Sequence, residues 1–137
     1  MKKIIPILTL TIVALFLGGC SNQEKLQSNL DLQSKCSAKA KDFLDNYKET
    51  NPPGYNGYYS YENHYNSKSD KCYILIRGYS PDSLKNILFD AYENKDIAEC
   101  EAYSSGNSMM NFCGYPGSSE KYDLDKFNNF IKQYMEN

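Results

Sequence analysis

Apolar residues recur every three or four positions in two stretches of the chain, one before the middle and one at the end. In residues 30–47 these positions are Leu32, Cys36, Ala40, Phe43, Leu44 and Tyr47. In residues 123–135 they are Leu124, Phe127, Ile131 and Tyr134. This spacing places each set on one face of a helix, and Asp123 stands at the N-cap position of the second. The sequence therefore predicts an N-terminal and a C-terminal helix.

Alternating residues between these helices predict an antiparallel hairpin. In residues 58–65, three tyrosines (Tyr59, Tyr61 and Tyr65) point to one side. Residues 71–79, KCYILIRGY, place Cys72, Ile74 and Ile76 opposite Tyr73, Leu75 and Arg77. Both patterns are typical of strands, and the polar residues 66–70 supply the turn between them.

Residues 80–103 fit two structures. Ser80-Pro81-Asp82 is a helix-start signature, followed at helical spacing by Leu84, Ile87, Leu88, Ala91 and Tyr92. Residues 87–93 and 97–103 can also pair as a second hairpin around Asn94-Lys95. Residues 104–119, rich in Gly, Ser and Asn, are expected to form a loop. The fold class that follows is α+β, with an N-terminal helix, an antiparallel sheet of about four strands and a C-terminal helix on its apolar face.

The first nineteen residues have the pattern of a secretory signal peptide. Lys2 and Lys3 precede fourteen uncharged residues, Ile4 to Leu17, which as a helix span about 21 Å and are too short for a permanent membrane span. Without this segment the chain has 13 basic and 17 acidic residues. That balance argues against nucleic-acid binding, which needs clustered cations. Residues 20–29 are expected to form a short tether, and residues 30–137 a single globular domain.

The end of the signal peptide, Leu17-Gly18-Gly19-Cys20, resembles the lipobox of bacterial lipoproteins. The resemblance implies that the chain is cut before Cys20 and that the Cys20 thiol carries diacylglycerol, often with a further acyl chain such as palmitate on the new amine. Two or three acyl chains suffice for stable membrane anchoring. Ser21 follows the cysteine, which favours an outer-membrane location facing the periplasm if the cell has two membranes. The alternative is a secreted protein whose signal peptide ends at a cysteine.

The other four cysteines, Cys36, Cys72, Cys100 and Cys113, are expected to form two disulfides in an exported protein. Three pairings are possible. The pairing Cys36–Cys72 with Cys100–Cys113 is favoured, because a Gly, Ser and Asn segment lets the last two approach. Gaps of 36, 28 and 13 residues, with one histidine in the chain, do not match a zinc site. No metal or cofactor is expected.

Three short segments resemble a group of small exported bacterial proteins of unassigned function. They are Asn63-His64-Tyr65-Asn66, Lys71-Cys72-Tyr73-Ile74-Leu75-Ile76 and Leu88-Phe89-Asp90-Ala91-Tyr92-Glu93-Asn94-Lys95. The resemblance covers about residues 36–135. It implies a pair of strands around Glu93-Asn94-Lys95, which favours the hairpin over the helix, and it implies no activity.

Tyrosine is the most distinctive residue type, with thirteen copies and no tryptophan. Tyrosine suits contact surfaces because it combines a large ring with a polar tip, although a small sheet can also use it as half-buried core. The candidate binding surface comprises Tyr58, Tyr59, Tyr61, Tyr65, Tyr73 and Tyr79. The first hypothesis is a monomeric, non-catalytic envelope protein that binds another protein through these residues, as inhibitors, immunity proteins and exclusion factors do. The second is a module that binds cell-wall glycan or a small ligand.

A hydrolase is the remote alternative, and it depends on His64. Glu62, two residues before His64 on a strand, would lie on the same face and could orient the imidazole. A structural role for His64 is favoured, since no nucleophile can be assigned beside it. The prediction is that the protein is not an enzyme.

Overall fold

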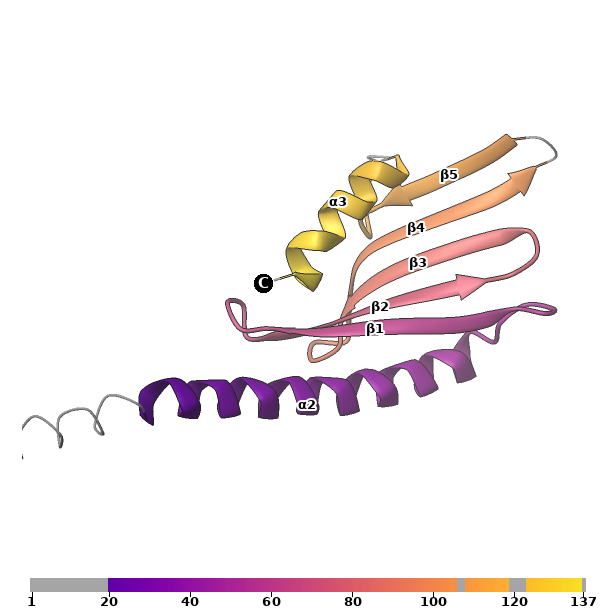
Figure 1. The fold of residues 1–137 in the computed structure, drawn as a ribbon. Helices are drawn as coiled ribbons and strands as arrows, with labels where there is room; N and C mark the ends of the chain where they lie inside the picture. The colour runs from indigo at the N-terminus through magenta and orange to yellow at the C-terminus, as the bar shows by residue number, and fades with distance from the viewer. Residues whose placement is uncertain (1–19, 106–107, 119–122, 137) are drawn as a thin grey trace, which may run out of the picture. The chain divides into compact units, whose positions relative to one another are not determined.

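The computed structural model describes residues 20–105, 108–118 and 123–136; the predicted signal peptide, residues 1–19, lies outside them. It contains helix α2 (Cys20–Thr50), a five-stranded antiparallel sheet and helix α3 (Leu124–Met135) (Figure 1). The strands follow one another across the sheet as β1 (Tyr58–Asn66), β2 (Lys71–Tyr79), β3 (Ser83–Asp90), β4 (Lys95–Ser105) and β5 (Ser108–Gly114). The predicted α+β class is confirmed, with five strands rather than about four.

The chain forms two compact units, residues 1–32 and residues 33–137. The described part of the first unit is helical: α2 begins at Cys20, ten residues before the predicted helix start. The residues expected to form a tether therefore belong to a helix, and residues 20–32 have a helical length of about 20 Å. Among the described residues, no helix is both long enough and apolar enough to cross a membrane.

In the second unit, α2 from Gln33 onward packs on one face of the sheet, called here the α2 face. Cys36, Ala40 and Leu44 are buried, as their helical spacing predicted. The Phe43 ring lies 4.7 Å, centroid to centroid, from the ring of Phe89 on β3. The helix ends at Thr50, just before two prolines that cannot continue it.

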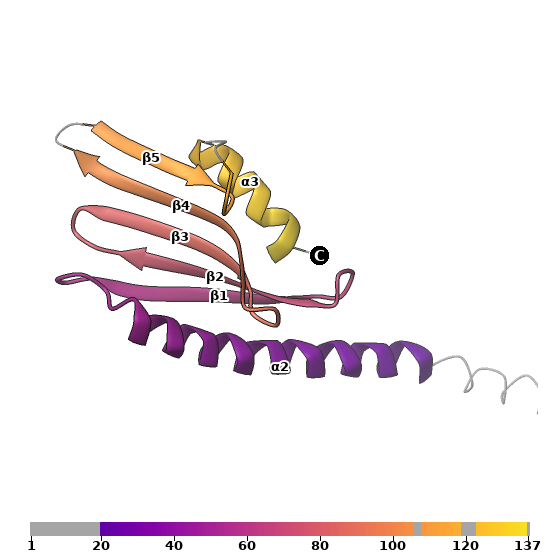
Figure 2. The ribbon, with the colours of Figure 1, turned by 180° about the vertical axis from the view of Figure 1, so that it is seen from behind.

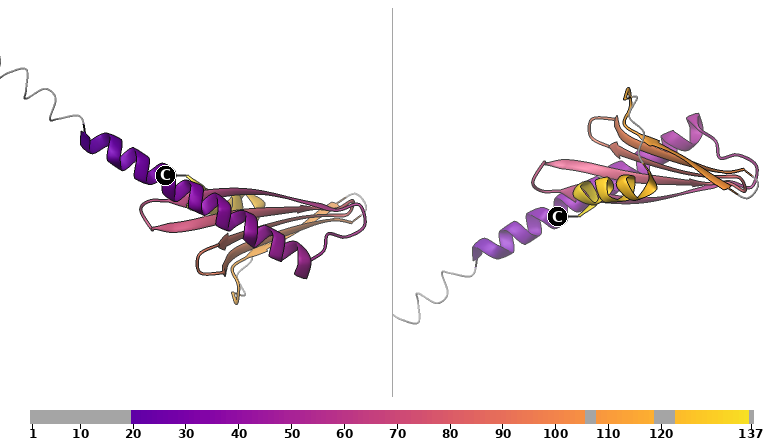
Figure 3. Two further views of the ribbon diagram at one scale, coloured as in Figure 1. Left: turned by 90° about the horizontal axis from the view of Figure 1, so that it is seen from below. Right: turned by 90° about the horizontal axis from the view of Figure 1, so that it is seen from above.

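Helix α3 packs on the opposite face, called here the α3 face, so the sheet lies between two helices (Figure 3). Phe127 of α3 belongs to a buried cluster whose other members are Tyr73, Leu75, Leu88, Ala98, Cys100 and Cys113. Asp123 caps the helix as predicted, its Oδ1 accepting a hydrogen bond from the Lys126 backbone N–H at 2.7 Å. Because both faces of the sheet are covered, neighbouring residues of β2 such as Ile74 and Leu75 are both buried.

Residues 83–90 and 95–105 form the β3–β4 hairpin, so the helix predicted as one alternative for residues 80–93 is wrong. The buried Asp90 closes the turn: its Oδ1 accepts from the backbone N–H groups of Tyr92 and Glu93 at 3.0 and 3.2 Å. Asn94 adopts a left-handed φ of 52°, which asparagine tolerates better than most residues. This turn lies where the resemblance to small exported proteins implied one.

Residues 104–119 do not form one loop as predicted, because they contain β5. Strand pairing with β4 runs from Ser105 opposite Ser108 to Glu99 opposite Gly114. Cys100 and Cys113 are directly opposite each other and are disulfide-bonded, and Cys36 of α2 is bonded to Cys72 of β2. These are the two pairs that the sequence favoured.

Candidate functional site

The six tyrosines proposed as a binding surface lie on two opposite faces of the sheet. The register of β1 and β2 places three of them, Tyr58, Tyr73 and Tyr79, on the α3 face. Tyr59, Tyr61 and Tyr65 lie on the α2 face, on the side of β1 that the alternating pattern predicted. The six residues therefore do not form one continuous surface.

Tyr58 and Tyr79 form the accessible aromatic pair on the α3 face. They are directly opposite in the β1–β2 ladder, and their rings stack with centroids 4.8 Å apart and planes inclined by 18°. Tyr58 is 59% exposed and Tyr79 is half-buried. Figure 1 shows why this end of the sheet is open: α3 lies over the other end, where β1 ends and β2 begins.

An ion pair lies beside the stacked rings on the same face. Arg77 Nη1 is 2.6 Å from Glu62 Oε1, and Ser60 stands opposite Arg77 in the ladder. The Arg77 side chain is 29% exposed and that of Glu62 is 59% exposed. Exposed ion pairs add little stability, but this one fixes the guanidinium next to the tyrosines. We call Tyr58, Tyr79, Glu62 and Arg77 the tyrosine surface.

On the α2 face, Tyr59 is part of the contact between the helix and the sheet. Its ring meets that of Tyr47 edge to face, with centroids 5.5 Å apart, and covers Gly78 of the neighbouring strand. The pKa of Tyr47 is raised above its ordinary value, mainly because the side chain is partly buried and secondly because Tyr59 is nearby. Tyr61, one alternation further along β1, is 37% exposed. Tyr59 therefore has a structural role, and Tyr61 is isolated from the stacked pair.

Tyr65 and Tyr73 are buried, so their assignment to the binding surface is wrong. The Tyr65 hydroxyl donates to Asp70 Oδ1 at 2.5 Å, and this bond raises the pKa of Tyr65 to about 12. Tyr73 meets Tyr134 of α3 edge to face, with ring centroids 5.0 Å apart. Tyr65 lies on the face covered by α2 and Tyr73 on the face covered by α3. Each buries its ring in the core.

His64 stands opposite Tyr73 on the α3 face and is half-buried. Glu62 lies on the same face, as the alternation predicted, and it forms its ion pair with Arg77. His64 is not among the residues that line the three cavities described below. The geometry therefore gives no support to a catalytic site built on His64.

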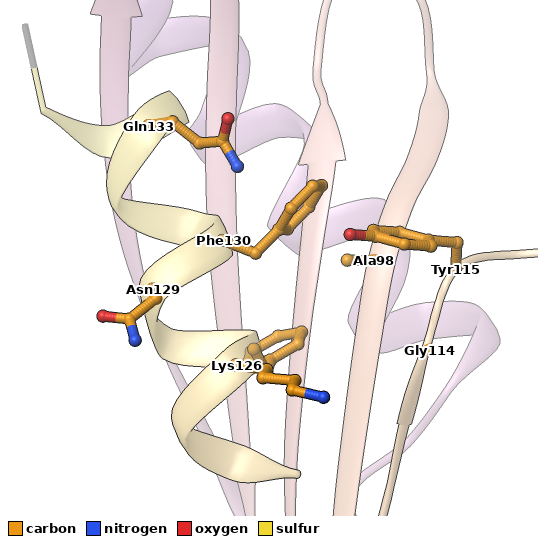
Figure 4. Close-up of a pocket in the computed structure, with 8 residues that line it drawn as sticks. Ala98, Gly114, Tyr115, Lys126, Asn129, Phe130 and Gln133 are labelled. Carbon is orange, nitrogen blue, oxygen red and sulfur yellow. The ribbon is translucent and has the colours of Figure 1, made fainter. Parts of the chain in front are cut away.

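The most apolar of the three cavities lies between α3 and the end of β5 (Figure 4). It has a volume of about 340 Å³, and Phe127, Phe130 and Tyr115 form its apolar walls with Ala98 and Gly114. Phe130 points toward Tyr115, and their ring centroids are 4.7 Å apart. Lys126, Asn129 and Gln133 of α3 supply its polar atoms.

A second cavity, of about 360 Å³, lies beside the β3–β4 turn and includes buried Asp90. Lys71 Nζ is 2.8 Å from both Asp90 Oδ2 and Glu93 Oε1. Both bonds raise the pKa of Lys71 above its ordinary value, and the bond to Asp90 contributes the most. Since Asp90 also closes the turn, the cluster has a structural role that the sequence analysis did not find.

The third cavity, of about 750 Å³, lies between α2 and the β3–β4 part of the sheet. Phe43, Tyr47 and Phe89 form its floor with polar residues around them, including Lys85 and Asp96. Lys85 Nζ is bonded to Glu99 Oε1 at 2.6 Å, so charges of both signs are present. Nothing in this lining selects one class of ligand.

An exposed apolar group on the β4–β5 hairpin was missed by sequence reasoning. Tyr103, Met110 and Phe112 are 38%, 47% and 46% exposed, and the first and last make a ring contact at 6.2 Å. They share the α2 face, because Tyr103 stands opposite Met110 and Glu101 opposite Phe112. The sequence signal was Gly106-Asn107, a pair of residues typical of a two-residue hairpin loop, between two stretches that can alternate.

Within the described residues, no three histidine, cysteine, aspartate or glutamate side chains are grouped to hold a metal ion. No protein-family model, curated protein or solved structure matches this chain. Its function is therefore inferred from the geometry described above.

Proposed function

We propose that the protein is a lipid-anchored, non-catalytic component of the cell envelope, held by acyl chains on Cys20, that binds another protein. The anchor rests on the lipobox resemblance of residues 17–20. Two disulfides in the second unit are typical of an exported protein. Residues 20–32 then act as a helical spacer between the anchor and the second unit.

The exposed stack of Tyr58 and Tyr79 is the observation that carries the binding proposal. Interfaces concentrate their binding energy in aromatic and arginine side chains, and here two tyrosines and Arg77 lie together on an open part of the sheet. The Glu62 ion pair holds the arginine in place before a partner arrives, which reduces the entropy lost on binding.

Glycan binding, the second hypothesis, fits this surface less well. A sugar stacks on an exposed ring face, whereas Tyr58 and Tyr79 each turn one ring face toward the other. Small-ligand sites are concave, and neither tyrosine lines any of the three cavities described above. An exposed surface that carries aromatic residues and arginine is typical of protein interfaces.

A photo-cross-linking amino acid at Tyr58 tests the surface in the producing cell. The matched control carries the same amino acid at Tyr92, which is 42% exposed at the opposite end of the sheet. We expect a discrete protein adduct from position 58, none from position 92, and loss of the adduct when Tyr79→Ala is added. Equal labelling from both positions, or an adduct that Tyr79→Ala leaves unchanged, would contradict the proposal.

The anchor is tested separately with Cys20→Ser and the neighbouring control Ser21→Ala. Labelling with a fatty-acid analogue is expected to modify the wild-type chain and Ser21→Ala but not Cys20→Ser. The Cys20→Ser chain is also expected to leave the membrane fraction. If it stays with the membranes, lipid on Cys20 is not what holds the protein there.

A further inference from the structure

Strand β5 is an outer strand of the sheet, and its sequence lacks the usual protection of such strands. An outer strand presents backbone N–H and C=O groups that can pair with another chain. Natural monomers block this pairing with charged residues, proline or a covering element. Residues 108–114, SMMNFCG, contain no charged residue and no proline. Figure 2 shows β5 at the margin of the sheet, on the side away from β1.

The opposite outer strand, β1, is protected. The backbone N–H of Tyr65 donates to Oε1 of Gln33 on α2 at 2.8 Å, which occupies an outward-pointing group of this strand. Glu62, near the middle of β1, adds a charge at the same margin. The two margins of one sheet therefore differ, and β5 is the one suited to pairing.

We propose that β5 pairs antiparallel with β5 of a second copy of this chain, joining two five-stranded sheets into one. An antiparallel pair centred on Asn111 places Ser108 opposite Gly114 of the second copy and Met110 opposite its Phe112. Methionine next to an aromatic ring is a favourable contact, and the symmetry makes it twice. No charge on either strand opposes this pairing.

The exposed side chains support a second copy as the occupant. Met110 and Phe112 lie on the α2 face and are each nearly half exposed, and Tyr103 extends the same apolar group. In the proposed pair the two groups become neighbours on one face of the joined sheet. An uncharged strand that is complementary to itself favours its own copy over a partner recognised by charge.

The geometry is also compatible with anchoring in one membrane. The twofold axis that relates two antiparallel strands of a continuous sheet is perpendicular to the sheet, so each face of one copy continues into the same face of the other. Residues 33–50 of both copies then lie on the same side. The proposed dimer differs from the monomer that the sequence analysis expected.

The test is the mass of the full-length chain in a non-ionic detergent, measured by sedimentation equilibrium with the detergent density-matched. We expect a dimer, and we expect Met110→Lys to weaken it about tenfold or more, because a charge then faces apolar atoms at the junction. Tyr61→Lys is the matched control: it adds the same charge at an exposed tyrosine of the protected strand β1 and is expected to leave the dimer intact. Far-UV circular dichroism checks that both variants are folded.

The register is tested by Asn111→Cys, at the expected axis, with Tyr61→Cys as control. Oxidation is expected to link two copies through position 111 and not through position 61. A monomeric mass for the wild-type chain, a dimer that Met110→Lys leaves intact, or linkage of position 111 to a different protein would each overturn the proposal.

Discussion

The two disulfides hold different parts of the second unit together, and removing each one separately tests what chain connectivity contributes to stability. Cys36–Cys72 joins α2 to β2 and closes a loop with a sequence separation of 36. Cys100–Cys113 has a separation of 13 and joins residues that are already opposite each other in the β4–β5 ladder. The first bond therefore restricts the unfolded chain more than the second.

The loop lengths set the expected magnitude. The chain-entropy relation gives a stabilisation at 25 °C of about 3.8 kcal/mol for the longer loop and about 2.9 kcal/mol for the shorter one. The four cysteines are 0–2% exposed, so replacing either pair by alanine removes a similar amount of buried sulfur. We therefore expect the Cys36→Ala/Cys72→Ala variant to lose about 1 kcal/mol more than the Cys100→Ala/Cys113→Ala variant.

Urea unfolding of residues 21–137, followed by circular dichroism, measures both losses without the thiol of Cys20. The midpoint and the slope of each transition must be fitted separately, because a change in slope reports a change in the unfolded ensemble. Equal losses, or a larger loss from the Cys100–Cys113 pair, would refute the assignment of the difference to loop length.

Two further substitutions test contacts of β1 and β2. Tyr65→Phe is expected to make the fold less sensitive to alkaline pH. The bond to Asp70 raises the pKa of Tyr65 to about 12, so the native state keeps a proton that the unfolded chain releases near pH 10, and stability falls between these values. The free energy of unfolding is expected to drop less in the variant between about pH 9 and about pH 11, and an equal drop would count against this. Gly78→Ala is expected to destabilise by about 1–3 kcal/mol in urea unfolding, because its Cβ would lie 2.8 Å from Tyr59 Cε1. The control Gly54→Ala, with no atom within 4 Å of the new Cβ, is expected to cost less than about 0.5 kcal/mol.

The sequence predicted elements whose pattern has one period and one buried face. The spacing of Leu124, Phe127 and Ile131 and the cap at Asp123 gave α3, and alternation gave the β1–β2 hairpin. The sequence pattern could not distinguish a helix from a strand in residues 80–93, because β3 lies between two helices and is buried on both faces. Ile87, Leu88 and Phe89 are all buried on alternating faces, and a continuous apolar run does not show a strand period.

The start of α2 could not be predicted for a different reason. Residues 20–29 are polar with one leucine, so they carry no helical stripe, and their helix is continuous with residues whose apolar face packs on the sheet. Strand β5 was missed because it has only seven residues, too few for a clear alternating pattern, and because the neighbouring Gly and Ser residues are typical of a loop. Its strand form depends on pairing with β4, which local sequence does not show.

The candidate site was predicted in composition but not in placement. Of the six tyrosines, Tyr58 and Tyr79 form an accessible pair, while Tyr65 and Tyr73, with the same chemistry and the same strands, are buried. Tyr65 lies on the face that α2 covers and Tyr73 lies under α3, whereas Tyr58 and Tyr79 lie on the α3 face beyond the end of α3. This placement is a tertiary property.

That difference also explains why one residue type serves both purposes. Helix α3 covers one end of its sheet face, so each strand crosses from a covered region to an open one (Figure 1). At the covered end, Tyr73 buries its ring against Tyr134 while its hydroxyl lies 3.2 Å from Ser69 Oγ. At the open end, Tyr58 stacks on Tyr79 and is 59% exposed. Its polar hydroxyl group makes this exposure less costly than the exposure of a leucine or phenylalanine side chain would be. The exposed stack is thus a continuation of the core beyond the reach of its helix, and a partner that covered it would complete the same layer.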